Sequence, residues 1–290
     1  MQLAKNLVST LRWRLIPVRY AGKAVRTLTA KPVPPRISET SSTGHPEADI
    51  VTMRETGYAA GPSIDPETLG EILAIFEPRA RGVTPKKGGH PFVNLFTVDD
   101  VSSDNPVFRF AVSPAVLDAA HDYFGGQFQF DSIQVLYSWP TDGELAESQL
   151  WHKDYGDTKS FHCVTYLNDV NGPDDGPFVF VDKNDTRRIS KSLLIRRIND
   201  EDFGEELGDG VIHRIYGSAG QSIFVDPSAC YHFGSRCINP RLALFVTFST
   251  HRPMVGAQPL IQKAKTRALE AAAEVRPDLS RAYLGRIFGC

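Results

Sequence analysis

Three side chains in the second half of the sequence have the types and spacing of a metal centre. His152 and Asp154 are two residues apart in the segment Gln-Leu-Trp-His-Lys-Asp. On a strand, residues i and i+2 project from one face about 7 Å apart, so this imidazole and carboxylate can share a metal ion. His232, which follows a predicted strand and an Asp-Pro turn, is the best candidate for a third ligand. Two histidines and one carboxylate on one side of a metal are typical of non-haem Fe(II) oxygenases.

A basic residue close to the third ligand predicts an anion-binding function. Arg241 lies nine residues after His232 and opens the apolar run 242–248, so we expect its side chain to point into the interior. A buried guanidinium needs an anionic partner, and a dicarboxylate co-substrate would supply one through a bidentate pair. Arg236 is the alternative anion binder, because it lies nearer to His232 in the sequence.

Further polar residues on the predicted strands are candidates for co-substrate or substrate contacts. Gln134 and Tyr137 precede the metal motif, and His162 and Thr165 follow it. Strand alternation places His162 and Thr165 on opposite faces, without saying which face is inside. We expect His162 not to be an additional metal ligand, and we expect His213 to have a structural function.

The elements that must position these residues are mostly strands. After Gly126, short runs of β-branched and aromatic residues are separated by Gly, Pro, Asn and Asp, which predicts a sandwich or barrel. The predicted strands are 128–139, 161–167, 178–181, 211–216, 222–225 and 242–249. Helices are predicted after Asp65-Pro66, after Ser113-Pro114 and over 257–274. The predicted fold class is therefore mainly β with flanking helices.

Composition excludes several classes of protein. The chain has 290 residues, of which 41% are hydrophobic and 23% are charged, so it is neither collagen-like nor wholly disordered. It contains no run of about 18 apolar residues, so we expect no transmembrane segment. Residues 1–36 contain eight Lys and Arg residues and no acid, which leaves 24 basic against 34 acidic residues for the rest of the chain. The acidic body argues against a nucleic-acid partner.

The N-terminal part differs from the rest of the chain. We predict a basic arm and linker over 1–47, with a helix near 2–15 and a Pro- and Ser-rich linker over 31–46, followed by one domain over 48–290. Four cysteines without a paired pattern favour a reducing compartment, so we expect a cytoplasmic protein. Alternatively, residues 1–36 are a mitochondrial transit peptide, or they make peripheral contact with an anionic membrane.

Five segments carry a resemblance to a known family, and they span about residues 48–250. They are 53–69, 113–125, 151–154, 175–181 and 217–241. Together they resemble the phytanoyl-CoA dioxygenase family of Fe(II)/2-oxoglutarate-dependent oxygenases. The interval of nine residues between His232 and Arg241 is shorter than the family's usual spacing, and the family's Pro-Gly-Ser-His stretch reads here as Val181 to Asn184.

The resemblance implies a fold, a reaction and a set of site residues. The implied fold is a double-stranded β-helix, a cupin-like jelly roll. His152, Asp154 and His232 are implied as Fe(II) ligands, Arg241 as the partner of the distal carboxylate of 2-oxoglutarate, and Ser235 as a hydroxyl donor to that carboxylate. The implied reaction uses O₂, decarboxylates 2-oxoglutarate to succinate and CO₂, and oxidises a C–H bond of a small-molecule or lipid-like substrate.

Other functions stay open at this point. A carboxylate at Asp154 favours hydroxylation or a related oxidation over halogenation, because related halogenases have a small residue there. A non-catalytic jelly-roll binding protein and a cupin-type metalloenzyme of another class are the alternatives. The polar segment 184–210 is a predicted lid, and its acids would disfavour strongly anionic substrates such as acyl-CoA.

Overall fold

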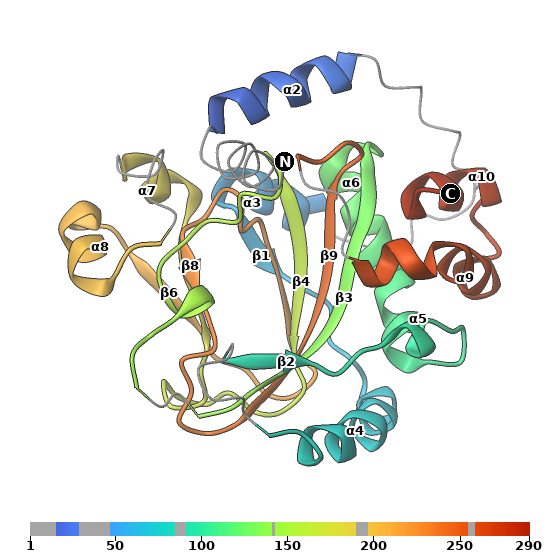
Figure 1. Cartoon of the computed structure of the whole chain (residues 1–290), viewed down its shortest axis with the longest axis horizontal. Helices are drawn as coiled ribbons and strands as arrows, with labels where there is room; N and C mark the ends of the chain where they lie inside the picture. The colour runs from blue at the N-terminus through green and yellow to red at the C-terminus, as the bar shows by residue number, and fades with distance from the viewer. Residues whose placement is uncertain (1–15, 29–46, 85–90, 141–142, 190–196, 255–258) are drawn as a thin grey trace, which may run out of the picture.

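Two antiparallel sheets face each other in the computed structural model, which describes residues 16–28, 47–84, 91–140, 143–189, 197–254 and 259–290. The larger sheet has six strands in the order β1-β7-β4-β9-β3-β2, and the smaller has three in the order β6-β5-β8. Sequence neighbours such as β8 and β9 lie in different sheets (Figure 1). This crossing of the chain between two sheets is the jelly-roll arrangement that the family resemblance implies.

The strands agree closely with the predicted ones. Their bounds are β1 Tyr58–Ala60, β2 Phe92–Asn94, β3 Phe128–Ser138, β4 Ser160–Tyr166, β5 Phe178–Val181, β6 Ile212–Ile215, β7 Ser222–Val225, β8 His232–Phe233 and β9 Arg241–Thr250. The short strands β1, β2 and β8 were not predicted, because two or three residues carry too little alternation to be recognised.

The helices include all those predicted within the described residues. Their bounds are α2 Ile16–Leu28, α3 Glu47–Thr56, α4 Pro66–Arg81, α5 Pro106–Val112, α6 Ala119–Phe124, α7 Lys183–Arg188, α8 Asp200–Leu207, α9 Pro259–Val275 and α10 Arg281–Phe288. Asp65 caps α4 by accepting a hydrogen bond from the backbone N–H of Thr68, as its position before Pro66 predicts. Gly125 ends α6 in the left-handed conformation. The helix predicted near 2–15 and the linker predicted over 31–46 lie outside the described residues.

Alternation along β4 separates the inside of the sandwich from the outside. Phe161 and Cys163 pack into the main hydrophobic cluster, which includes residues of the flanking helices. Val164, on the opposite face, packs with Phe178 and Phe180 of the smaller sheet. His162, Val164 and Tyr166 therefore face the interior. Because cross-strand partners share a face, the residues of β7 and β9 that pair with these three also face inward. The β3 residues that pair with those β9 residues face inward as well.

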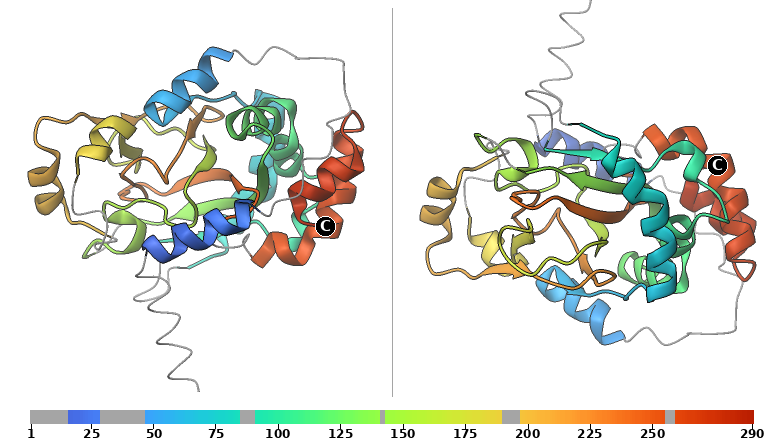
Figure 2. Two further views of the ribbon diagram at one scale, coloured as in Figure 1. Left: turned by 90° about the horizontal axis from the view of Figure 1, so that it is seen from above. Right: turned by 90° about the horizontal axis from the view of Figure 1, so that it is seen from below.

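Helices cover the outer faces of both sheets. Seen from above and below, α9 and α10 lie along one side of the larger sheet, and α4 and α5 continue that layer (Figure 2). On the smaller sheet, α8 covers the outer face: Phe203 stacks on Trp151 with ring centroids 4.0 Å apart, beside Val179 and Val181. The described part of the segment 184–210 therefore packs on the back of the smaller sheet, which corrects the predicted lid.

One helix of the predicted basic arm packs against the domain. Lys23 of α2 is buried, and its Nζ forms an ion pair with Asp157. The same ammonium donates to the hydroxyls of Thr158 and Thr250, at 2.6 and 2.7 Å. Asp157 lies three residues after Asp154, so α2 is fastened to the segment that carries this predicted metal ligand.

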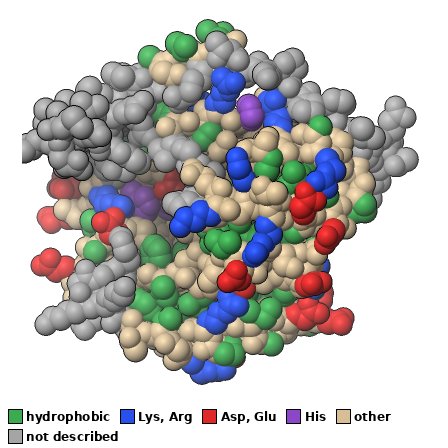
Figure 3. Space-filling model, turned by 45° about the vertical axis from the view of Figure 1, so that its right-hand side comes forward, with side chains coloured by type: hydrophobic (Ala, Val, Ile, Leu, Met, Phe, Trp, Pro, Cys, Tyr) green, Lys and Arg blue, Asp and Glu red, His purple; other side chains and the backbone are tan. Residues whose placement is uncertain are grey.

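The surface is mixed in charge. On the face in Figure 3, described basic and acidic side chains alternate with small hydrophobic areas. Among the described residues, no helix is both long and apolar enough to cross a membrane.

Candidate metal and co-substrate site

The two predicted histidine ligands lie directly opposite each other. His152 and His232 form an isolated antiparallel bridge, in which each backbone N–H donates to the other residue's carbonyl at 3.0 and 2.9 Å. Their rings are neighbours, with centroids 4.3 Å apart. His232 also pairs with Phe180 of β5, so the bridge extends the smaller sheet and presents both imidazoles to the interior.

Hydrogen bonds to the backbone fix the tautomer of both rings. Nδ1 of His152 contacts the carbonyl of Leu150 at 2.7 Å, and Nδ1 of His232 contacts that of Cys230 at 3.1 Å. A carbonyl only accepts, so each Nδ1 carries the proton and each Nε2 has a free lone pair. Burial lowers the pKa of both rings to about 4, and for His152 the neighbouring His232 adds to this effect. Both imidazoles are therefore neutral at pH 7, as metal ligands must be.

Asp154 completes the group from a loop. It lies beyond the bridge in a segment without regular structure, and its backbone N–H donates to the carbonyl of Pro227 at 2.9 Å. This corrects the expectation that His152 and Asp154 occupy one strand: the chain leaves the sheet after His152. Oδ1 of Asp154 lies 3.8 Å from Nε2 of His152 and 3.9 Å from Nε2 of His232.

The three donor atoms fit one metal ion. They all lie within 4.8 Å of one another. Metal–nitrogen and metal–oxygen bonds of about 2.1 Å allow two ligands of one ion to be up to about 4.2 Å apart, and the distances of 3.8 and 3.9 Å from Asp154 to the two histidines lie within that limit. The Asp154 side chain is 40% exposed, whereas those of the two histidines are almost buried, so the open side of this group lies on the Asp154 side. The His/Asp/His donor set is the one expected for non-haem Fe(II).

Arg241 carries a charge inside the sandwich that no described side chain balances. It is only 2% exposed, and it opens β9 opposite Ser138 of β3. One guanidinium nitrogen donates to the carbonyl of Gly176 and another to Oγ of Ser235 at 3.0 Å, while Nε has no hydrogen-bond partner. No described acidic side chain forms an ion pair with it. Burial lowers its pKa, because a charge in this position lacks solvation.

Ser235 and Arg236 have different partners. Ser235 is buried, and its hydroxyl also accepts a hydrogen bond from Ser138 at 3.1 Å, so it lies beside the Arg241 guanidinium as expected. Arg236 forms a bidentate pair with Asp200 of α8, with both distances 2.8 Å. Its charge is thus already balanced, whereas that of Arg241 is not.

The other four polar candidates divide between the two faces. Gln134 pairs with Phe245, and His162 with Thr247, so both lie on the inner face. Tyr137 pairs with Leu242 and packs in the main hydrophobic cluster on the outer face of the larger sheet. This outward position contradicts the expected contact of Tyr137 with the co-substrate. Thr165 also faces outward, and its hydroxyl lies 2.6 Å from that of Ser222. His213, which was expected to be structural, stacks on Phe180 with ring centroids 5.0 Å apart.

One inner-face residue was not anticipated from the sequence. The pairing of β3 with β9 shifts between Phe130 and Ser132, so that Asp131 is an extra residue at a β-bulge. Its Oδ2 accepts a hydrogen bond of 3.4 Å from Thr247. The adjacent polar pair Asp131-Ser132 within an alternating run was the available signal, because a bulge interrupts alternation at such a point.

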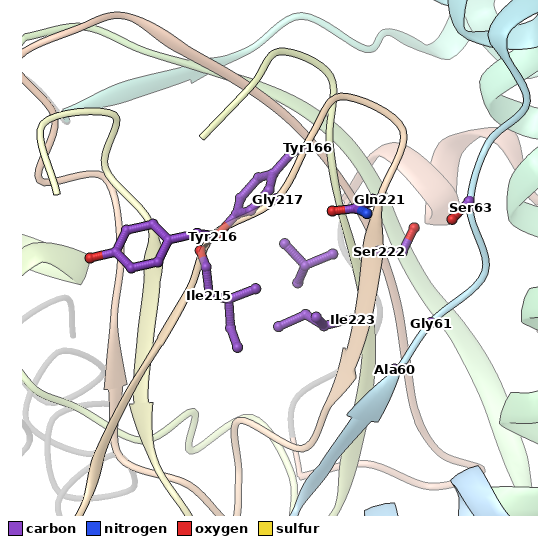
Figure 4. Close-up of a pocket in the computed structure, with 11 residues that line it drawn as sticks. Ala60, Gly61, Ser63, Tyr166, Ile215, Tyr216, Gly217, Gln221, Ser222 and Ile223 are labelled. Atoms are coloured by element: carbon purple, nitrogen blue, oxygen red, sulfur yellow. Dashed lines mark hydrogen bonds between the residues drawn. The ribbon is translucent and has the colours of Figure 1, made fainter. Parts of the chain in front are cut away.

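A separate pocket lies away from these residues. It has a volume of about 330 Å³ and opens between β1, β7 and the turn after β6 (Figure 4). Ile215, Ile223 and Tyr166 supply apolar walls, and Gln221 and Ser63 supply polar ones. None of the candidate metal ligands lines this pocket, and neither does Arg241.

Comparison with known proteins supports this architecture. No protein-family model matches the chain, and no curated protein matches its sequence. Among solved structures, EctD from S. alaskensis in its apoform matches with a TM-score of 0.54 and 16% identity, over 79% of this chain and 88% of EctD. The complex of EctD with 2-oxoglutarate and 5-hydroxyectoine gives a TM-score of 0.53 and 18% identity, over 76% and 83% of the two chains.

A second enzyme has the same arrangement. The non-haem alpha-ketoglutarate-dependent carbocyclase SnoK from nogalamycin biosynthesis matches with a TM-score of 0.51 and 16% identity, over 76% of this chain and 88% of SnoK. The chain has the double-stranded β-helix fold of 2-oxoglutarate oxygenases. These similarities confirm the fold that the resemblance implies, and the candidate His/Asp/His ligands lie together within it.

Proposed function

We propose that this protein is an Fe(II)/2-oxoglutarate-dependent oxygenase that oxidises a C–H bond of a small-molecule substrate. The observation that carries the proposal is the combination of the His152, Asp154 and His232 group with an unpaired buried guanidinium. A metal site alone would suit many enzymes. Arg241 is buried and has no acidic partner among the described residues, so it additionally favours binding of an anion such as a carboxylate.

Each residue has a definable function in this proposal. Nε2 of His152 and of His232 would donate lone pairs to Fe(II), and Asp154 would donate a carboxylate oxygen. Arg241 and Ser235 would bind the distal carboxylate of 2-oxoglutarate and so orient its keto acid end toward the three ligands. Iron and 2-oxoglutarate, when bound, would supply the oxidising chemistry with O₂, while the protein orients the reactants and excludes water. A carboxylate ligand at Asp154 favours hydroxylation over halogenation.

An anaerobic titration tests this proposal directly. Fe(II) and 2-oxoglutarate are added to purified protein, and the visible charge-transfer absorption of the chelate is followed. We expect a band in the wild type, no band in His232→Ala, and a band in Arg241→Ala only at much higher 2-oxoglutarate. Arg236→Ala is the matched control, because this neighbouring arginine is paired with Asp200 and should not affect the titration.

The possible results separate the hypotheses. Bound metal without any band in the wild type would contradict the oxygenase and favour a cupin-type metalloenzyme of another class. Absence of metal binding would favour a ligand-binding protein. A greater loss in Arg236→Ala than in Arg241→Ala would show that the wrong arginine has been assigned to the co-substrate.

We further propose a reducing, cytoplasmic location and an anionic membrane contact for the arm that precedes the domain. The membrane contact would not include Lys23, because its ammonium is buried against Asp157 and is not available to lipid. A deletion test should therefore remove residues 1–15 and keep α2. Unchanged sedimentation with phosphatidylserine vesicles after that deletion would contradict the membrane contact.

A further inference from the structure

The β-bulge in β3 directs a carboxylate into the interior next to the metal site. In a bulge, two residues of one strand oppose a single residue of its partner. Here Thr247 of β9 is that single residue: its hydroxyl contacts Asp131 at 3.4 Å and Ser132 at 2.8 Å. Thr247 in turn pairs with His162 on β4, so Asp131 joins the inner face at the level of that histidine.

This row of inner-face groups ends at a candidate metal ligand. Nε2 of His162 lies 3.9 Å from Oδ2 of Asp154, the oxygen that does not face the two ligand histidines. The row therefore runs along the larger sheet from Asp131 through Thr247 to His162, and then to Asp154 on its loop. Asp131 is thus linked through two inner-face residues to Asp154, whose side chain is 40% exposed and marks the open side of the metal group.

Asp131 has no positively charged partner in the part of the chain that the structure describes. Among the described residues, no lysine, arginine or histidine forms an ion pair with it, and Thr247 gives its single hydrogen bond. Burial is the largest effect on its carboxyl and raises the pKa to about 7, with smaller contributions from the charges of Asp154 and Asp157. A divalent ion at the triad would oppose these contributions and favour the carboxylate form. A buried carboxylate then needs a cation.

We propose that Asp131 selects the substrate by binding a positively charged nitrogen, an alkylammonium or guanidinium group, in the opening beside the metal. This inference rests on the proposed function for the position of the metal, and it adds the chemical class of the substrate. The ion pair would hold the substrate on the Asp154 side, while Arg241 holds the co-substrate at the other end of the interior. Thr247 positions the carboxylate through its hydroxyl.

The test compares a charged probe with an uncharged one of the same size. Protein loaded with redox-inert Zn(II) and 2-oxoglutarate is titrated with butylammonium and with 1-butanol, and binding is followed by saturation-transfer NMR. We expect the wild type to bind butylammonium at least about tenfold more tightly than 1-butanol, the gain of a charged hydrogen bond. Asp131→Asn should remove this preference. Asp99→Asn is the control, because that side chain is 95% exposed on the surface.

The variants also separate this inference from the oxygenase proposal. Asp131→Asn should retain the Fe(II)/2-oxoglutarate band, and Asp131→Ala should repeat the binding result if the asparagine variant folds poorly. An unchanged preference in both variants, or equal binding of the two probes to the wild type, would overturn the cation site. Loss of the band in Asp131→Asn would overturn it as well, because Asp131 would then belong to the metal centre.

If the wild type shows no band, the probes are titrated into metal-free Asp154→Asn protein. This variant lacks the Asp154 charge that disfavours the carboxylate form of Asp131. An Asp131-dependent preference for butylammonium there would preserve the cation site while the oxygenase proposal fails. Its absence would overturn both.

Discussion

At the scale of single residues, Arg241 is the most informative side chain. It has two hydrogen bonds and an unsatisfied Nε in an interior that holds no described acidic partner for it. Desolvating a guanidinium is unfavourable, so this arrangement destabilises the protein when no anion is bound. Such a residue is understandable as part of a binding site, where the ligand supplies the missing charge.

Replacing Arg241 by an apolar residue should therefore separate stability from binding. We expect the free energy of unfolding of Arg241→Met to equal that of the ligand-free wild type or to exceed it by up to about 2 kcal/mol, because a buried charge is removed. We also expect 2-oxoglutarate with Zn(II) to stabilise the wild type and not this variant. Both are measured by calorimetry. A strongly destabilised variant would show instead that Arg241 is a structural residue.

Asp131 gives a pH-dependent prediction. Its folded-state pKa of about 7 lies above the unfolded value of 3.8, so the folded protein holds this proton more tightly. The corresponding stability is present below about pH 4 and is lost as the pH rises to about 7. In metal-free protein we expect Asp131→Asn to be more stable than the wild type at pH 8, by about 2 kcal/mol, and much less so at pH 5. Urea denaturation at both pH values tests this, and a constant difference would contradict it.

At the scale of elements, the metal ligands depend on supports that are remote in the sequence. The loop carrying Asp154 is fastened to α2 through Asp157 and Lys23. The bridge carrying His152 is backed by α8 through Trp151 and Phe203. Neither support contains a candidate ligand, but each packs directly behind one.

Breaking the α2 contact should loosen the Asp154 loop. Lys23→Met leaves the buried Asp157 without its cation, and removing one partner of a buried pair destabilises a protein by about 3 kcal/mol or more. We expect earlier thermal unfolding and faster proteolysis between residues 16 and 28. Lys263→Met, at an exposed position of α9, is the matched control. Equal stability of the two variants would mean that α2 does not hold the loop in solution.

Removing the α8 contact should affect the histidine bridge. Phe203 is almost completely buried against Trp151, so Phe203→Ala is expected to destabilise the protein by about 3 kcal/mol. Because Trp151 immediately precedes His152, we also expect Zn(II) to bind more weakly, as measured by competition with a chromogenic chelator. Phe203→Leu should restore most of the affinity. If metal affinity is unchanged in Phe203→Ala, the bridge is rigid without α8.

At the scale of the whole molecule, the sandwich has an apolar core behind the larger sheet and a polar interior at one end of the strands. The outer cluster joins α4, α5, α9 and α10 to the larger sheet. The inner face instead contains His162, Thr247 and Asp131, which stable packing alone would not select. The outer layer therefore supplies the larger apolar core, and the polar end of the interior is left for binding.

Ligand binding should consequently stabilise the whole domain. A ligand present at about 100 times its Kd adds about 2.7 kcal/mol to the free energy of unfolding. We expect Zn(II) and 2-oxoglutarate together to raise the unfolding temperature of the wild type more than either one alone, and EDTA to reverse the effect. Asp154→Ala should respond to neither. An equal response of that variant would place the metal elsewhere.

Local sequence patterns were sufficient to predict the candidate ligands and most strands. His152, Asp154, His232 and Arg241 were found because each lies within a few residues of an alternating run or a turn, and such patterns are local. The family resemblance extended this to a jelly roll. Helix α4 was predicted from an equally local pattern, because Asp65 and Pro66 together mark its start.

Which residues face the site depends on the packing of the two sheets, and this could not be predicted locally. Alternation divides a strand into two faces, but the second sheet defines the interior, so Tyr137 was placed wrongly and His162 was left undecided. A bulge interrupts the alternation of the two faces within a strand, which is why Asp131 was overlooked. The ion pair of Lys23 with Asp157 joins residues 134 positions apart, and no local pattern encodes such a contact.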